Sequence, residues 1–238
     1  WITDSRVFFR SAALAVRALG AENVIGVRLP YRTSSPDSLE HAALVADQLG
    51  IGLETIDITR AVDGYVEAAD PKADVTRRGN VAARVRMIAL FDLAAKHRAL
   101  PLGTSNKSER LLGYYTWHAD DAPPVNPLGD LFKTQVMQLA SHLQVPADVI
   151  DKPFSADLVE GQSDEEDLGI SYAKADRILL ALLRGLSQPA IVAQGFTAEE
   201  VELVRRRLEG THWKRRLPTV AMVSQTAVGE YYLRPVDY

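Results

Sequence analysis

The chain has 238 residues, of which 47% are hydrophobic and 24% are charged, and its formal net charge is −4. This composition is typical of globular proteins. The small negative net charge gives no indication of a basic surface that would bind nucleic acid. No apolar run reaches the roughly 18 residues of a membrane span, so we expect no membrane contact. The chain has no cysteine, which excludes disulfides and thiol chemistry and fits a cytoplasmic protein.

The N-terminal stretch "FFRSAALAVRALGAENVIGVRLP" (Phe8–Pro30) changes character near Ser11. The residues before Ser11 have the pattern of an amphipathic surface helix, and those from Ala12 onward read as a helix buried on nearly every side. Asn23–Leu29 reads as a buried strand. The pattern leaves open whether one helix or two precede that strand.

A helix is predicted next, with Ser35 as its N-cap, Pro36 at its first position and Gly50 at its end. Two further strand patterns cover Gly52–Ile58 and Leu100–Gly103, and a long helix reaching about His97 begins at Gly79 between them. The alternation of strands and helices predicts an α/β fold with a doubly wound parallel sheet and helices on both faces. Ligands of such sheets bind beyond the strand ends, here after Leu29, Ile58 and Leu102.

The second half of the chain is predicted to be mostly helical. The helices cover roughly Asp130–Leu143, Tyr172–Leu183 and Ala198–Leu208. There is no internal repeat, and we treat residues 1–238 as a single domain.

The run "GTSNKSE" (Gly103–Glu109) follows the third strand end and has two interpretations. In the first, Asn106 and Glu109 form a capping box at the start of a helix. In the second, Thr104 and the helix N-terminus face a nucleotide, and Glu109 holds Mg²⁺ through a hard oxygen ligand.

Lys133, in "GDLFKTQV", would occupy the third helical position if Asp130 is the N-cap. A lysine there is unfavourable next to the positive end of the helix dipole unless an anion lies nearby. It is therefore either a phosphate ligand or a surface lysine whose stem covers apolar surface.

Arg84 shares a helical stripe with Met87, Ile88 and Phe91, and the other side of that helix is also apolar. A helix of this kind is expected to be buried, for example in a subunit interface. A buried arginine needs an acidic partner, which could be a protein carboxylate or an acidic ligand.

Two acidic runs have simpler interpretations. Ser163–Gly169 ("SDEEDLG") is most simply a solvated loop or helix start, and His118–Asp121 ("HADD") has no second histidine at zinc-ligand spacing. No serine or cysteine nucleophile constellation is present, so we assign no catalytic side chain.

Five ordered motifs, "GNVAARVRM", "GTSNKSERLLGYYT", "VNPLGDLFKTQV", "KPFSADL" and "DEEDLGISY", closely resemble ammonia-dependent NAD⁺ synthetases of the N-type ATP pyrophosphatase family. The resemblance extends from about Ile25 to the C-terminus and implies an adenine nucleotide alpha hydrolase-like, Rossmann-type fold that works as a homodimer. It also implies a ligase that makes NAD⁺ from deamido-NAD⁺, ammonia and ATP, with AMP and pyrophosphate as products.

The resemblance also assigns roles to residues. It implies that Thr104, Lys133 and Ser155 contact ATP and that Glu109 binds Mg²⁺. Arg84 and Lys214 would contact deamido-NAD⁺. Such a site works by positioning and charge stabilisation, without a covalent side-chain intermediate.

The chain departs from the family pattern at three positions, and at two of them, Trp117 and Pro124, other members have a lysine and an acid that contact the dinucleotide. Trp117 stands where many members have a lysine, Ala119 where many have glycine, and Pro124 where many have an acid. We do not transfer those roles, although Trp117 could stack on a substrate ring. These changes keep open an amide ligase with another acid substrate.

The largest departure is the absence of the strand and Gly-rich "SGGxDS" loop that hold pyrophosphate in the family. Losing a central strand would orphan buried backbone groups at roughly 1–3 kcal/mol each. We therefore predict a further segment, on the order of 20 residues, between about residues 11 and 13, which would appear as a break between Arg10 and Leu14. A normal spacing and a continuous helix there would instead favour a non-catalytic nucleotide-binding relative.

Overall fold

The structure is a computed structural model that describes residues 5–143, 163–216, 220–221 and 223. Its helices and strands in chain order are α1 Ser5–Leu19, η1 Ala21–Asn23, β1 Ile25–Arg28, α2 Pro36–Leu49, β2 Gly52–Thr55, α3 Thr59–Ala69, α4 Val75–His97, α5 Lys107–Leu112, α6 Lys133–His142, α8 Asp164–Leu168, α9 Tyr172–Leu183, α10 Gln188–Val192, α11 Ala198–Gly210 and η2 His212–Arg215. Within these described ranges, no helix is long and apolar enough to cross a membrane.

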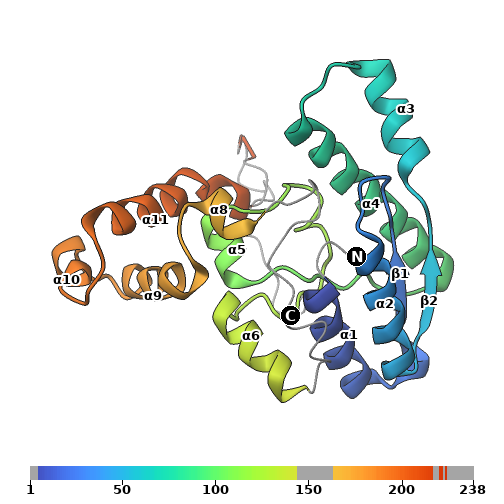
Figure 1. Ribbon diagram of the computed structural model, residues 1–238, viewed down its shortest axis with the longest axis horizontal. Coiled ribbons are helices and arrows are strands. Elements are labelled where there is room, and N and C mark those ends of the chain that lie inside the picture. Colours follow the sequence, from blue (N-terminus) through green and yellow to red (C-terminus); the bar gives the residue numbers. More distant parts are fainter. Residues whose placement is uncertain (1–4, 144–162, 217–219, 222, 224–238) are drawn as a thin grey trace.

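The strands β1 and β2 are parallel and in register from the Ile25–Gly52 pair to the Arg28–Thr55 pair, and Figure 1 shows them between α2 and α4. On one face, Val27 and Leu29 pack with buried residues of α3 and α4. On the other face, Leu53 packs with residues of α1 and α2. The predicted α/β fold, with helices on both faces of a parallel sheet, is therefore confirmed.

The third predicted strand, Leu100–Gly103, forms only one parallel bridge in the described chain, between Leu102 and Val125. The hydroxyl of Ser11, in α1, donates to the Gly103 carbonyl oxygen at 3.3 Å. This contact ties α1 to the loop that leads into α5.

The helix α1 runs without interruption from Ser5 to Leu19, so the structure has no break between Arg10 and Leu14. The further segment expected there stays a prediction. Phe9, Ala12 and Ala13 are all buried. They pack against α2 and its neighbours, so the residues on both sides of Ser11 belong to one amphipathic helix.

A second group of helices forms a lobe beside the sheet. Figure 1 shows α8, α9, α10 and α11 projecting away from β1 and β2, with α5 and α6 nearer to the sheet. The core of this lobe combines Leu112 of α5 with Ile178 and Leu179 of α9 and Val201 and Val204 of α11. The loop after Leu102 enters α5 and thereby connects the sheet to this lobe.

The helix α4 begins at Val75, four residues before the predicted start at Gly79. Its N-cap is Asp74, whose carboxylate accepts the Arg77 backbone N–H at 2.8 Å. Within the single chain this helix is not buried on most sides, because Ile88 is 62% exposed and Phe91 is 39% exposed. The predicted apolar stripe is thus an exposed face of the helix. Burial of this face in a subunit interface stays a prediction.

Candidate active site

The capping box predicted at the start of α5 is present. The Asn106 side-chain oxygen accepts the Glu109 N–H at 3.0 Å, and Glu109 Oε2 accepts the Asn106 N–H at 3.2 Å. This arrangement uses only one of the two carboxylate oxygens. The structural and functional interpretations of Glu109 are therefore compatible, because Oε1 remains for a second partner.

That second partner is Lys133. Its Nζ lies 2.8 Å from Glu109 Oε1 and 3.7 Å from Asp164 Oδ2, and its side chain is only 2% exposed. Tyr172 completes the surroundings, with its ring centroid 5.1 Å from Nζ and its hydroxyl donating to Asp164 Oδ2 at 3.4 Å. The interpretation of Lys133 as a surface lysine is therefore wrong, and the expected nearby anion is here a protein carboxylate.

The start of α6 differs from the prediction. Lys133 is the first residue of α6, and Asp130 pairs with Lys107 at 2.6 Å instead of capping the helix. The Gln135 side chain accepts the Phe132 N–H at 2.9 Å, which satisfies a donor just before the first turn. This start places Lys133 at the positive end of the helix, beside the carboxylate of Glu109.

Arg84 is exposed, so the prediction of a buried arginine is wrong for this residue. Its guanidinium donates to the Trp117 carbonyl oxygen at 3.1 Å. The buried arginine of α4 is Arg86, which is 2% exposed and donates to the Leu29 carbonyl oxygen at 3.1 Å. Two residues of helix turn a side chain by about 200°, so Arg84 and Arg86 lie on nearly opposite faces of α4.

Lys214 lies in η2 and contacts the same loop, residues 113–117, as Arg84. Its Nζ donates to the carbonyl oxygens of Gly113 and Tyr115 at 2.8 and 2.9 Å. Burial lowers the pKa of Lys214, and the positive charge of Arg84 adds to this, whereas Asp120 and Asp121 oppose it. The two residues expected to contact deamido-NAD⁺ are thus close enough for their charges to interact.

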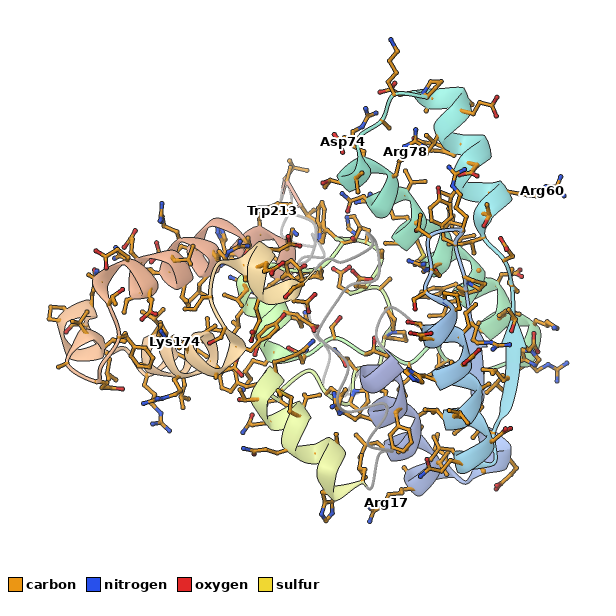
Figure 2. The ribbon with its side chains drawn as sticks, in the orientation of Figure 1. Arg17, Arg60, Asp74, Arg78, Lys174 and Trp213 are labelled. Carbon is orange, nitrogen blue, oxygen red and sulfur yellow. The ribbon has the colours of Figure 1, made fainter. Side chains whose placement is uncertain are left out.

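An aromatic cluster, Trp117 with Trp213 and His118, lies beside these two cations. The Trp117 ring is 5.0 Å from Trp213 at an interplanar angle of 89°, and 3.8 Å from His118 at 30°. Trp213 is 47% exposed. Figure 2 shows it at the end of α11, on the side that faces the N-terminal end of α4, where Asp74 is labelled. Aromatic faces beside cations suit a ligand that combines a heterocycle with anionic groups.

Gly113 allows the close approach between α5 and η2. It has φ of +66°, and a Cβ atom there would lie 2.4 Å from the Thr211 side chain. Its carbonyl oxygen is one of the two that hold Lys214. Only glycine satisfies both the left-handed backbone conformation and this contact.

Asp120 was not selected from the sequence as a site residue. Burial raises the pKa of Asp120 to about 6. The Asp120 carboxylate accepts the Thr116 N–H at 2.7 Å, which opposes this shift, whereas the negative charge of Glu109 adds to it. Asp164 was also missed, because its run reads as solvated. It is 5% exposed, whereas its neighbours Glu166 and Asp167 are exposed as predicted.

Two predicted ATP contacts, Thr104 and Ser155, differ in what the structure describes. Thr104 lies in the loop between Leu102 and α5, and it is partly buried. Ser155, with the "KPFSADL" motif around it, lies outside the described residues.

The NAD synthase family model matches residues 3–218. The ammonia-dependent NAD⁺ synthetase of Chlorobaculum tepidum is 49% identical over 217 residues, which are 91% of this chain and 78% of that protein. The corresponding protein of Trichlorobacter lovleyi is 48% identical over 89% of this chain and 77% of its own length.

The chain belongs to the NAD synthase family. Among solved structures, the NMN synthetase of Francisella tularensis has a TM-score of 0.80 at 27% identity and covers 92% of this chain and 86% of its own. The ammonia-dependent NAD synthetase of Campylobacter jejuni has a TM-score of 0.75 at 28% identity, with 92% and 88% covered.

Family membership confirms the ligase class predicted from the motifs, an ATP-dependent enzyme that forms a carbon–nitrogen bond in ammonia-dependent NAD⁺ synthesis. Continuity of α1 alone would have favoured a non-catalytic relative. Identities of 48–49% to ammonia-dependent NAD⁺ synthetases outweigh it.

Proposed function

We propose that this chain converts deamido-NAD⁺, ammonia and ATP into NAD⁺, AMP and pyrophosphate. In the first step, the nicotinate carboxylate attacks the α-phosphorus of ATP, pyrophosphate leaves, and a mixed acyl–phosphate anhydride forms. In the second step, ammonia attacks the acyl carbon, AMP leaves, and the nitrogen loses a proton to give the amide. Neither step needs a covalent protein intermediate, so the protein acts by alignment and charge.

The ATP half of the proposed site lies at the N-terminal turns of α5 and α6. The observation that carries the proposal is the buried contact between Lys133 and Glu109, at 2.8 Å, where the first turns of the two helices meet. Lys133 would bind the triphosphate in exchange for Glu109, and Thr104 and Ser155 would contact the rest of ATP. Buried charges and helix N-termini of this kind suit a metal–triphosphate complex.

Mg²⁺ fits this arrangement through Glu109, whose Oε1 would be released as Lys133 turns to phosphate. Among the described residues, no group of three side chains could hold a metal ion alone. Mg²⁺ in nucleotide sites takes one or two carboxylates and completes its shell with phosphate oxygens and water. When bound, it would neutralise charge on the phosphates.

The acid-substrate half of the proposed site lies around Arg84, Lys214 and the aromatic cluster. Arg84 and Lys214 supply positive charge for the phosphates, and Trp117 and Trp213 supply ring faces. Glu109 and Lys214 both have electrostatic interactions with Asp120. Asp120 therefore lies between the two halves, which suits a reaction in which the two substrates must meet.

An assay of AMP release with deamido-NAD⁺ and ammonium tests the proposal. We expect AMP and NAD⁺ in equal amounts, and no AMP when either substrate is omitted. ATP binding without AMP release would support the non-catalytic alternative instead.

A second acid substrate is favoured by Trp117, Pro124 and the likeness to an NMN synthetase. The acid that corresponds to NMN is the deamido mononucleotide, which has one phosphate in place of a pyrophosphate. The ratio of kcat/KM values for the dinucleotide and the mononucleotide decides between the two. A higher value for the mononucleotide would overturn the choice of deamido-NAD⁺.

We also propose that the protein is a cytoplasmic homodimer. Support for the dimer comes from α4, where Ile88 and Phe91 expose an apolar face next to Arg84. Sedimentation at micromolar concentration should give a dimer, and Ile88→Glu should shift it toward monomer. The matched control is Leu44→Glu on α2, where Leu44 is 54% exposed. A monomer for the unsubstituted chain would contradict the proposal.

A further inference from the structure

The carboxylate of Asp176 joins three helices in the middle of the helical lobe. It lies on α9 and is 4% exposed. Its Oδ2 accepts the backbone N–H and the hydroxyl of Thr134 at 2.9 and 2.8 Å, and its Oδ1 accepts the Ser108 hydroxyl. The Ser108 oxygen in turn accepts the Lys133 backbone N–H at 2.8 Å. One side chain of α9 thus fixes the first turns of both α5 and α6.

Among the residues that the structure describes, these bonds satisfy a buried carboxylate without an ion pair to a basic side chain. A carboxylate is only an acceptor, and here it has three protein donors, two of them from the first turn of α6. The positive end of the α6 dipole favours a negative charge at that place. Because burying a charge is costly, an apolar residue would serve packing at this position better. The presence of a carboxylate here is therefore explained by its hydrogen bonds to Ser108 and Thr134.

The residues that Asp176 binds are sequence neighbours of the two charged residues of the proposed ATP half-site. Ser108 precedes Glu109, and Thr134 follows Lys133. Glu109 and Lys133 come from different helices, yet their charged atoms lie 2.8 Å apart. Their separation depends on the relative position of the α5 and α6 backbones, and the Asp176 bonds fix that position at the adjacent residue on each helix.

We propose that Asp176 is a positioning residue for ATP and its metal, which acts through Ser108 and Thr134 on Glu109 and Lys133. This inference rests on the proposed function of those two residues. Asp176 contacts no substrate. Its effect is therefore confined to the ATP half-site, and the acid substrate, bound near Trp117 and Lys214, depends on it little.

The test is Asp176→Asn, which preserves shape but removes the charge and one acceptor. We expect the KM for ATP and the Mg²⁺ concentration for half-maximal rate to rise about tenfold, because small displacements at reacting groups are costly. The KM for the acid substrate should stay within about twofold. Calorimetry should give a matching loss of ATP affinity without turnover. Glu166→Gln is the control, because Glu166 is an exposed carboxylate of the same lobe.

A double variant separates positioning from a purely structural role. In a Lys133→Met background, Asp176→Asn should add little to the KM for ATP, because both changes act on the same contact. Should Asp176→Asn prove too unstable, Thr134→Val removes only the hydroxyl bond and should raise the KM for ATP about threefold, the loss of roughly one hydrogen bond.

Three results would overturn the inference. They are equal KM increases for both substrates, a lower Tm with unchanged kinetics, and full additivity with Lys133→Met. If the unsubstituted chain did not bind ATP, the proposed function would fail first, and this inference with it.

Discussion

Lys133 is buried and Lys214 is partly buried, and different partners hold their ammonium groups. Lys133 faces the carboxylates of Glu109 and Asp164, whereas Lys214 faces the neutral carbonyl oxygens of Gly113 and Tyr115. A lysine paired with carboxylates must exchange partners before it can bind phosphate. A lysine held by carbonyls is positioned without its charge being cancelled. In the proposed site, the ATP half is thus closed by its own counter-ions, and the acid half is lined by aromatic rings of which Trp213 is exposed.

Glu109→Gln tests the closed half most strongly. Glutamine keeps the cap to the Asn106 N–H but loses the charge for the metal, so turnover should fall on the order of 100-fold. A thermal melt run beside the AMP assay checks folding. If Glu109 acted only as a cap, the Tm of Glu109→Gln would be unchanged. Because the variant also loses the ion pair with buried Lys133, we expect its Tm to decrease. Near-normal turnover would show that Glu109 is only a cap.

Lys133→Met should have the next largest effect. It removes a charge-assisted bond to phosphate, so ATP affinity should fall about 10- to 100-fold. Stability should not improve, because Glu109 loses a buried partner. Isothermal titration with ATP and Mg²⁺ measures both affinity and stoichiometry. Unchanged ATP affinity would contradict the phosphate role.

Trp213→Leu probes the acid half. Replacing an exposed ring by an aliphatic side chain should raise the KM for the acid substrate about fivefold, the value of one stacking contact. The KM for ATP should not change. Steady-state kinetics with each substrate varied in turn measure the two constants. An effect on ATP alone would show that the two halves are assigned the wrong way round.

The smallest effect is a pH dependence of stability from Asp120. Its pKa is raised to about 6 on folding, above the roughly 3.9 of an unfolded aspartate. The folded state therefore binds more protons between these values, and stability falls as pH rises from about 4 to 6. Asp120→Asn removes this slope, so its Tm advantage should grow over that range in melts at fixed ionic strength. A constant difference would mean that the pKa is not raised.

Local sequence signals predicted helix ends well where one residue type determines the backbone. Ser35, Pro36 and Gly50 delimit α2 as expected, and the Asn106–Glu109 capping box is present. Tyr172–Leu183 was predicted with the bounds that the structure gives. These features depend on contacts within a few residues, which sequence spacing specifies directly.

Features that depend on distant contacts could not be predicted in the same way. The helix α6 does not begin with Asp130 as its N-cap, because Asp130 pairs with Lys107 of α5. On α4, Arg86 is buried instead of Arg84, because packing against other elements determines which face of a long helix is buried. Nothing in the sequence distinguishes Asp164 and Asp176 from other acidic residues, because their partners on α5 and α6 are distant in the chain. Local spacing and the family resemblance both indicated Lys133 and Glu109, but neither showed what holds them in place.

The glycine at the end of α5 determines how well the two halves are aligned. With a Cβ at position 113 only 2.4 Å from Thr211, any side chain there would push η2 away from α5. Trp213 and Lys214 would move with it, whereas Glu109, one turn earlier in α5, would stay. A reaction that forms a bond between two bound substrates tolerates almost no such misalignment. In the proposed site, Gly113 would act as the spacer that keeps acid and ATP within bonding range, and its contribution would appear in kcat even if each substrate still bound normally by itself.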